Sequence, residues 1–334
     1  MTTIKGVAEL AKVSQSTVSR VLTGHARVAN ETKERVLKAI KDLDYSPNLS
    51  AQSLASKRSN SIGMLVGTAS GPYFPSIMRA VEETARNNGF HLIPTSGDAT
   101  RSEELDAVNF LKSKQVDGLI IHVGKLADHD LLEIVNETPA TIILNHYIPE
   151  IAENCINLDE EMGGYLATKY LLENGHTKIA CITGPMIQND CRGRLQGYCR
   201  ALKEFAIKYD ANLVVEGRFD LEKNLEAPRK LLDRDLQVTA IFCLNDQIAL
   251  GVYDVLKDRH LSVGDDLSVI GYDNSFFCSH VTPKLTTINF PTREMSEEAT
   301  QKVISLVKKK KYLMPQKLLP KLIIRNSVKK INEF

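Results

Sequence analysis

Tryptophan is absent from the 334-residue sequence, and aromatic residues of all kinds make up only 6% of it. Long hydrophobic runs are absent too: no stretch of about 18 apolar residues occurs, so the sequence predicts no transmembrane helix. The first residues lack the apolar stretch of a secretory signal, and we therefore expect a cytoplasmic protein. Hydrophobic residues at 43% and charged residues at 25% exclude a disordered or fibrous chain and fit about two globular domains, with room for a small third unit.

The six cysteines and eight histidines show none of the spacings that hold metals or redox-active disulfides. No C-x-x-C pair is present, which excludes a zinc ribbon and a thioredoxin-type site. In a reducing compartment these cysteines are expected to be free thiols, buried or half-buried. We therefore predict no metal site.

Motifs for nucleotide cofactors and for common hydrolases are also missing. The sequence has no G-x-G-x-x-G fingerprint, no G-x-x-x-x-G-K-[ST] loop, no H-E-x-x-H and no G-x-S-x-G. An enzyme would need a base beside a ligand cleft, and Asp246 and Asp273 are the candidates for it. We predict no catalytic residue, no cofactor and no enzymatic activity.

Positive charge is concentrated at the N-terminal end of a nearly neutral chain. The net charge is +1, yet residues 1–60 contain ten Lys and Arg against five Asp and Glu, a net charge of +5, and the remainder carries −4. A basic segment on a mildly acidic body indicates a polyanionic partner. A solvated basic surface is the alternative, and the motifs inside the segment decide between the two.

The basic segment has the pattern of a helix-turn-helix unit. Residues 4–11 and 18–22 carry apolar residues at helical spacing, and Ser14 between them is a good N-cap for the second helix. Val13 in the turn is expected to point inward, and a third segment with apolar residues over 36–43 would close a small core. The polar face of the second helix fits the major groove of duplex DNA, although an ordinary amphipathic helix with a solvated face would look the same.

These residues resemble a known family. The run Thr17-Val18-Ser19-Arg20-Val21-Leu22 and the segment 44–51 are similar to the head of the LacI/GalR family of bacterial repressors. The resemblance implies a transcriptional repressor that reads bases with Gln15, Ser16 and Arg20, while Arg27 reaches the groove from the next loop. The residues that it places at DNA phosphates are Thr3, Ser14, Thr17, Ser19 and Asn48.

Two residues depart from the family pattern. Gly6 stands where an Asp in the first helical turn is usual, which removes a favourable charge at the helix N-terminus and costs on the order of 1 kcal/mol. Lys12 replaces the common turn glycine at a small cost in strain. We therefore predict a head of low intrinsic stability that folds best against DNA or a dimer partner.

Residues 47–60 are predicted to form a hinge between the head, 1–46, and a body, 61–334. The segment permits a helix, but a helix this short persists only when it packs on something. The resemblance implies that two such helices pair in the minor groove, with Ala51 and Leu54 at the DNA and Leu54 as the apolar wedge. A flexible tether is the alternative.

The body alternates short apolar strands with helices, which predicts an α/β fold with parallel sheets covered on both faces. We expect two similar lobes, an N-lobe of about 61–158 and 289–316 and a C-lobe of about 159–288 and 317–334. The predicted strands are 62–66, 90–94, 117–122, 140–144, 178–183, 213–216, 238–243, 267–271 and 317–324. The predicted helices are 75–88, 102–114, 128–136, 160–174, 192–207, 222–233, 246–259 and 292–309.

Polar and aromatic clusters follow several of these strands, at the sheet edge where open α/β folds bind ligands. Each cluster alone could be a helix cap, but several converging on one edge indicate a ligand cleft between the lobes. The resemblance extends over this body and implies an effector domain similar to periplasmic sugar-binding proteins. It implies polar effector contacts from Arg194, Asn245 and Asp273, a further contact from Asn145, and walls formed by Tyr73, Phe74 and Phe219.

Within the family the likeness is to galactose-responsive repressors, through segments 144–149, 153–159 and 194–198. The sequence therefore predicts a homodimer that binds palindromic double-stranded operator DNA and is released when a sugar, with galactose expected first, closes the lobes. A corepressor-type member with another sugar or a purine as effector is the alternative. A free-standing sugar-binding protein and a sugar-processing enzyme are the remaining classes.

Overall fold

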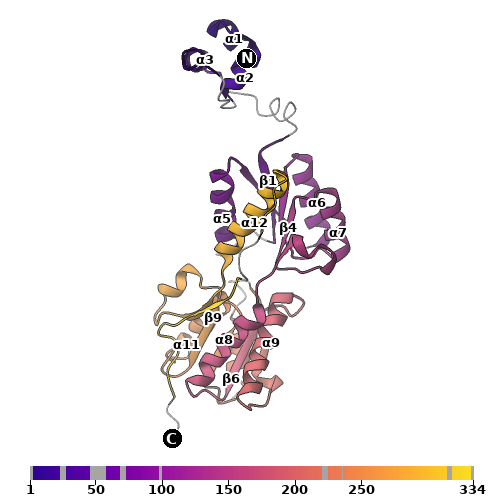
Figure 1. Ribbon diagram of the computed structural model, residues 1–334. Coiled ribbons are helices and arrows are strands. Elements are labelled where there is room, and N and C mark those ends of the chain that lie inside the picture. Colours follow the sequence, from indigo (N-terminus) through magenta and orange to yellow (C-terminus); the bar gives the residue numbers. More distant parts are fainter. Residues whose placement is uncertain are drawn as a thin grey trace. The chain divides into compact units, whose positions relative to one another are not determined.

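The computed structural model describes residues 3–22, 28–45, 58–67, 73–97, 100–219, 225–234, 236–313 and 318–331. It divides into two compact units, Met1–Ser59 and Asn60–Phe334, the head and the body (Figure 1). Each unit has its own core. Four residues predicted to contact DNA lie outside the described residues: Arg27, Asn48, Ala51 and Leu54.

The head consists of α1 (Ile4–Ala11), α2 (Gln15–Leu22) and α3 (Asn30–Asp42). Val7, Val18 and Val36 have no exposed surface and lie at the centre of its core, which Val13 also contacts as predicted. Leu37 differs from the prediction, because 48% of it is exposed even though it lies in the apolar pattern of the third helix. A three-helix unit of this size buries only one stripe of each helix.

Both departures from the family pattern in the head show their local consequences. Thr3 caps α1, and its Oγ1 accepts a hydrogen bond from the Gly6 N–H at 3.3 Å. Lys12 ends the helix with φ 53° and ψ 49°, a left-handed conformation that glycine adopts without strain. The turn between α1 and α2 therefore has the left-handed residue that such a turn requires, but a lysine adopts this conformation less readily than a glycine.

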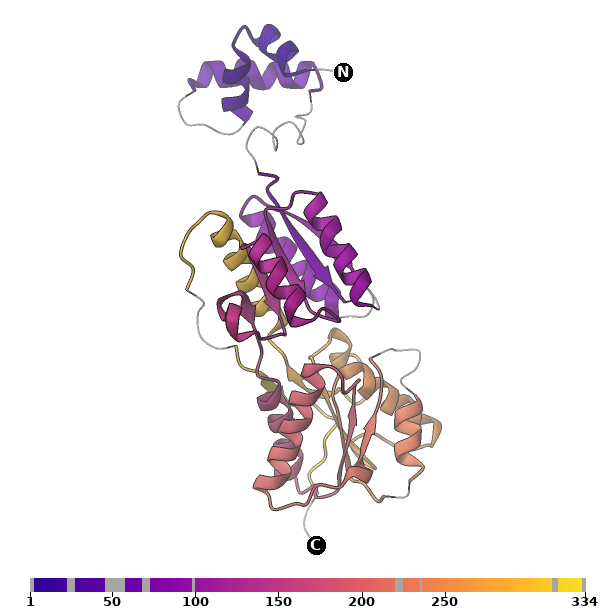
Figure 2. The same cartoon turned by 90° about the vertical axis from the view of Figure 1, so that its right-hand side faces the viewer.

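The N-lobe of the body is a five-stranded parallel sheet in the order β2-β1-β3-β4-β5. Buried residues divide its helices between the two faces: α5 and α12 pack on one face, and α6 and α7 on the other (Figure 2). Its strands are β1 (Ser61–Val66), β2 (His91–Ser96), β3 (Gly118–His122), β4 (Thr141–Leu144) and β5 (Cys155–Ile156). Its helices are α5 (Tyr73–Asn87), α6 (Arg101–Ser113), α7 (Asp128–Glu137) and α12 (Thr292–Val307).

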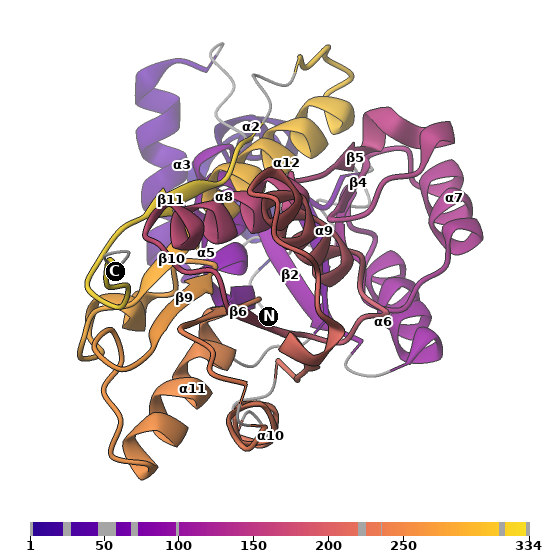
Figure 3. The ribbon, with the colours of Figure 1, turned by 90° about the horizontal axis from the view of Figure 1, so that it is seen from below.

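The C-lobe is a six-stranded sheet in the order β11-β10-β9-β8-β6-β7, parallel except for the edge strand β11. Helices α8 and α9 lie side by side on one face, and α10 and α11 contribute to the core on the other (Figure 3). Its strands are β6 (Ile179–Thr183), β7 (Val214–Glu216), β8 (Ala240–Cys243), β9 (Ser268–Tyr272), β10 (Thr286–Asn289) and β11 (Lys321–Ile323). Its helices are α8 (Glu160–Glu173), α9 (Asn189–Glu204), α10 (Glu226–Leu232) and α11 (Asp246–Asp258), and short 3-10 turns occur at η1 (Pro149–Asn154), η2 (Ala211–Leu213) and η4 (Phe276–Ser279).

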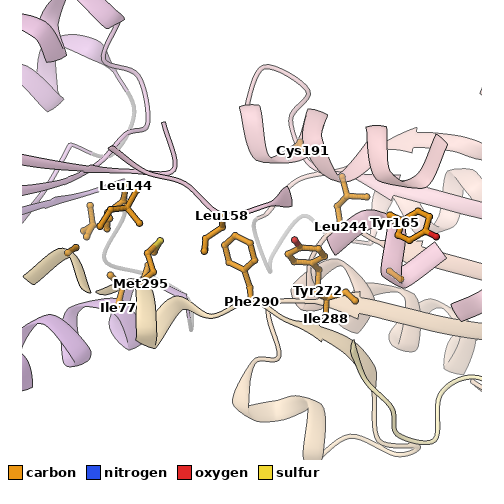
Figure 4. Packing of buried hydrophobic residues seen from close by; sticks show 14 of the residues in the cluster. Ile77, Leu144, Leu158, Tyr165, Cys191, Leu244, Tyr272, Ile288, Phe290 and Met295 are labelled. Atoms are coloured by element: carbon orange, nitrogen blue, oxygen red, sulfur yellow. The ribbon is translucent and has the colours of Figure 1, made fainter. Parts of the chain in front are cut away.

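Apolar side chains connect the two lobes where the chain crosses between them. Leu158 and Phe290 are buried on two of these crossings, and the Phe290 ring packs on Tyr272 with ring centroids 5.5 Å apart (Figure 4). The two lobes therefore share one continuous apolar core at the crossings.

The predicted α/β class and the alternation of strands and helices are confirmed. Two strands were not predicted: β5 has only two residues, and β10 is the polar sequence Thr-Thr-Ile-Asn. Neither gives the apolar run by which a buried parallel strand is recognised. The third helix of the C-lobe series, predicted over 222–233, is observed over Glu226–Leu232, and residues 222–224 of the predicted range lie outside the described residues.

Candidate functional site

The second helix of the head presents a polar face. Ser14, Gln15, Ser16, Ser19 and Arg20 are exposed, Thr17 is half-buried, and the apolar residues of α2 point into the core. The face therefore carries amide, hydroxyl and guanidinium groups, which are the side-chain groups that bind base edges and phosphates in DNA.

Ser14 fixes the start of this helix, as predicted. Its Oγ accepts a hydrogen bond from the Thr17 N–H at 3.2 Å and lies 2.7 Å from the Ser16 Oγ and 2.9 Å from the Thr17 Oγ1. No acidic residue occupies the first turn of α2. The exposed N-terminus of the helix, with its partial positive charge, can accept a phosphate without repulsion.

In the body, close packing of α8 on α9 brings two charged side chains together. A Cβ atom on Gly164 would lie 2.0 Å from the Arg194 carbonyl oxygen, and one on Gly197 would lie 2.1 Å from the Glu161 carbonyl oxygen. Only glycines permit the two helices to approach this closely. Arg194 of α9 consequently reaches Glu160 at the start of α8.

Arg194 is buried and contacts groups from several segments of the C-lobe. Its Nε donates to the Glu160 carboxylate at 2.8 Å, and its Nη1 donates to the Leu244 carbonyl at 2.6 Å. The guanidinium lies 3.8 Å from the Tyr272 ring centroid. Its nitrogens also lie 3.7 Å from Asp273 and 4.0 Å from Asp190.

The cluster therefore contains more carboxyl groups than cationic groups. One guanidinium faces the carboxylates of Glu160, Asp190 and Asp273. Burial raises the pKa of Glu160, and raises that of Asp273 well above the usual range, although Arg194 opposes both shifts. The Asp273 Oδ1 is buried without a hydrogen-bond donor among the described residues. A ligand that supplies donors would satisfy it.

Asp246 holds the loop that carries Asp273. Its two oxygens accept hydrogen bonds from the Ser275 N–H and the Thr287 hydroxyl, both at 2.6 Å, and none of its side chain is exposed. Asp273 and Asn274 follow β9 with φ angles of 106° and 57°. Asp246 therefore holds the loop that carries Asp273 and has no exposed surface with which to act as a catalytic base.

The N-lobe contributes an aromatic wall from the start of α5 and the end of β3. Tyr73 and Phe74 meet edge to face at 5.1 Å, and the His122 ring lies edge-on to both, at 5.7 and 4.9 Å. Burial, and then the negative charges of Asp273 and Glu160, raise the pKa of Tyr73 well above its usual range, which places this wall near the charged cluster. Sequence reasoning missed His122, Glu160 and Asp190.

The other predicted contacts lie around this centre in different ways. Asn145, with φ 58°, lines a pocket of about 510 Å³ between the lobes together with residues 157–161 and 189–190. Phe219 packs its ring on Gly184, where a Cβ atom would lie 2.3 Å from the ring. Asn245 caps α11, because its Oδ1 accepts a hydrogen bond from the Ile248 N–H at 2.8 Å. The side-chain oxygen of Asn245 is therefore used as a helix cap, which is the alternative role that the sequence leaves open.

The described residues contain no group of three or more His, Cys, Asp or Glu that could hold a metal ion. No helix in that part of the chain is long and apolar enough to cross a membrane.

Comparison with known proteins assigns the two units. Residues 3–48 match the family model for bacterial regulatory proteins of the lacI family, and residues 168–328 match a periplasmic binding protein-like domain. The PurR transcriptional repressors of Vibrio vulnificus and Photobacterium profundum are each 36% identical to this chain over 335 residues, covering 99% of it and 100% of their own length.

Solved structures agree with this assignment. A lac repressor dimer bound to operator and an anti-inducer superposes with a TM-score of 0.86 and 29% identity over 98% of both chains. A LacI family regulator from Enterococcus faecium with bound ribose superposes with a TM-score of 0.73 and 26% identity, covering 81% of this chain and 100% of its own.

The relatives correct one prediction and confirm another. The PurR repressors match this chain over its whole length, and they do not support the special likeness to galactose-responsive members. They are transcriptional repressors, which confirms that this chain is not an enzyme. The chain belongs to the LacI family of bacterial regulatory proteins and is a DNA-binding transcriptional repressor.

Proposed function

We propose that the chain acts as a homodimeric repressor whose operator affinity is set by a small molecule bound in the cleft around Arg194. Two heads related by twofold symmetry would each place α2 in a major groove, so the operator would be palindromic. Gln15, Ser16 and Arg20 would read base edges, and Thr3, Ser14, Thr17 and Ser19 would contact phosphates. Their exposure on one helix face supports this assignment.

We propose a free purine base as the effector. The observation that carries this choice is the aromatic wall of Tyr73, Phe74 and His122, because flat rings pack against a planar heterocycle. Asp273 and Asp190 lie beside Arg194, and their carboxyl oxygens would accept hydrogen bonds from the amino and ring N–H groups of a purine. The PurR names of the full-length relatives point the same way.

A sugar is the second candidate. A relative with bound ribose and another bound to cellobiose share the fold at 26% and 29% identity. The carboxylates and Asn145 would serve sugar hydroxyls equally well, and Phe74 would pack on the apolar face of a sugar ring. Galactose belongs to this candidate and stays a prediction.

Fluorescence anisotropy with a labelled operator distinguishes the two candidates. The operator would first be selected from randomised palindromes, and the protein then titrated with adenine, guanine, hypoxanthine, ribose and galactose. A purine should change operator affinity at least tenfold, whereas a response to sugars alone would select the second candidate. Failure of every compound would contradict the proposed effector classes.

The same titration measures the sign of control. An effector acts only through its different affinity for the DNA-binding and the released states. Tighter operator binding with ligand would identify a corepressor, and weaker binding would identify the inducer mechanism that the sequence predicts.

A further inference from the structure

Four consecutive lysines, Lys308–Lys311, follow α12 in the body. All four are exposed. Within the described ranges of the chain, no carboxylate forms an ion pair with any of them; the Nζ of Lys308 instead lies 5.5 Å from the centroid of the Phe90 ring. The lysine run, as we call it here, is therefore a compact patch of uncompensated positive charge.

Stability of the helix does not account for a run of four. A cation near a helix C-terminus is favourable because of the helix dipole, but the effect fades within the last turn, so one or two lysines suffice. Lys309 also adopts φ 54°, at a position where glycine is the usual residue. Lys309 thus occupies a position where glycine would adopt the left-handed backbone conformation without strain.

The lysine run lies at the edge of the N-lobe where the chain enters from the head. Lys308 packs on Phe90, and the next residue, His91, donates its N–H to the Asn60 carbonyl at 2.8 Å. Asn60 immediately precedes β1, the first strand of the body. Figure 2 shows the end of α12 and the start of β1 at the same end of this lobe.

The length of the connecting segment limits how far DNA bound by the head can be from this edge. Residues 46–57 connect the two units, and a stretch from Tyr45 to Arg58 spans at most about 45 Å even when fully extended. Duplex DNA carries a negative charge for roughly every 1.7 Å of its axis, so it is the partner whose charge the lysine run complements.

We propose that Lys308–Lys311 form a second DNA-binding surface, which contacts the phosphates that flank the operator while the heads read its bases. Such contacts add affinity without sequence preference. The proposal depends on DNA binding by the head and is independent of which effector occupies the cleft.

The test measures operator affinity as a function of salt concentration. The variant changes all four lysines to Gln, and fluorescence anisotropy is recorded with a duplex of the operator alone and with one extended by about one helical turn on each side. On the extended duplex, the slope of log K against log salt should become less negative by about 0.9 for each phosphate that the variant no longer neutralises. On the short duplex it should change little, and the preference among operator sequences should stay the same.

The matched control removes the same charge elsewhere. Lys203, Lys208, Lys230 and Lys257 are exposed residues of the C-lobe, and changing all four to Gln should leave the slope on the extended duplex as in the wild type. Replacing Lys308–Lys311 by Arg should preserve the wild-type slope, because the charge is kept. Thermal unfolding followed by circular dichroism checks that each variant is folded.

Equal slopes for the two Gln variants on the extended duplex would overturn the proposal. That result would be expected if the lysine run served an acidic protein partner instead. If the wild-type protein showed no preference for any operator sequence, the DNA-binding function itself would be contradicted. Failure of the proposed second surface is therefore distinguishable from failure of the proposed function.

Discussion

Arg194 and Glu160 form a two-point ion pair that is almost completely withdrawn from solvent. Arg194 Nε lies 2.8 Å from Glu160 Oε2 and Nη2 lies 3.4 Å from Oε1, while the two side chains are 4% and 12% exposed. The Tyr272 hydroxyl donates to the same Oε2 at 2.9 Å. Removing one partner of a buried pair costs about 3–5 kcal/mol, because the other charge is left uncompensated. The pair therefore fixes the guanidinium in the cleft.

Substitution Arg194→Lys should weaken effector binding at least tenfold. A lysine keeps the charge but loses the planar guanidinium that bonds Glu160 at two points and lies over Tyr272. Calorimetry with the effector found by the operator titration measures the change. Operator affinity without effector should stay within about twofold, since the head is untouched.

Arg200→Lys is the matched control for this change. Arg200 lies on the same helix, but it is half exposed and its Nη1 is 3.3 Å from Glu161, away from the buried pair. Its replacement should leave effector affinity unchanged. Equal effects of the two substitutions would show that Arg194 has no special role in the cleft.

Substitutions Gln15→Ala and Ser16→Ala should change which operator is preferred and leave effector affinity as it is. Base contacts in the major groove discriminate by about 1–3 kcal/mol each, so affinity should fall mainly for the preferred sequence. Ser19→Ala should instead weaken binding to all sequences by a similar factor, as expected for a phosphate contact. Selection from a randomised duplex library measures all three, and uniform weakening by Gln15→Ala would reject its role as a base reader.

Substitution Gly6→Ala should stabilise the head by about 0.5–1 kcal/mol. The nearest side-chain atoms to a Cβ at this position lie 3.9 and 4.0 Å away, so the methyl group fits, and alanine loses less backbone freedom on folding than glycine. Lys12→Gly should stabilise it by a similar amount, because φ 53° strains a lysine. Slower hydrogen exchange of the α1 amides in the full-length chain measures the effect.

The control for the glycine prediction is Gly164→Ala in the body. There the new methyl group would lie 2.0 Å from the Arg194 carbonyl oxygen, so the body should be destabilised by about 1–3 kcal/mol or more. If Gly164→Ala stabilised the protein, or Gly6→Ala destabilised it, the space around these glycines would not determine the change in stability.

Features set by neighbouring residues were predictable from the sequence. Ser14 was assigned as a cap because a hydroxyl just before a helix accepts a backbone N–H, and the structure has that bond. The buried parallel strands β1, β3, β4, β6, β8 and β9 are predicted because such strands read as short apolar runs, whereas β5 and β10 lack such a run.

Features that depend on distant contacts were not predictable. Glu160 follows β5, a strand too short to leave a pattern, and it meets Arg194 only because Gly164 and Gly197 let two helices approach. His122 ends β3, and nothing local shows that Tyr73, 49 residues away, lies beside it. Asn245 shows a further limit, since a cap and a ligand contact have the same sequence pattern.

The protein should lose stability between pH 7 and pH 5 through His122. Burial, opposed by the nearby charge of Asp190, lowers the pKa of His122 to about 4, and its Nδ1 is buried without a hydrogen-bond partner among the described residues. In the unfolded chain the pKa is about 6.5, so below this pH the unfolded state binds the proton and is favoured. The resulting loss should be about 2 kcal/mol at pH 5 and should increase further as the pH falls towards 4.

Substitution His122→Gln tests this directly, because it removes the titrating ring from the end of β3. The free energy of unfolding, measured with urea by circular dichroism at pH 7 and pH 5, should fall by about 2 kcal/mol less in the variant than in the wild type. His91→Gln, which removes an exposed imidazole from the same lobe, is the matched control. If wild type and His122→Gln lose the same free energy between the two pH values, the imidazole is accessible to protons in the folded protein and the aromatic wall is open to solvent.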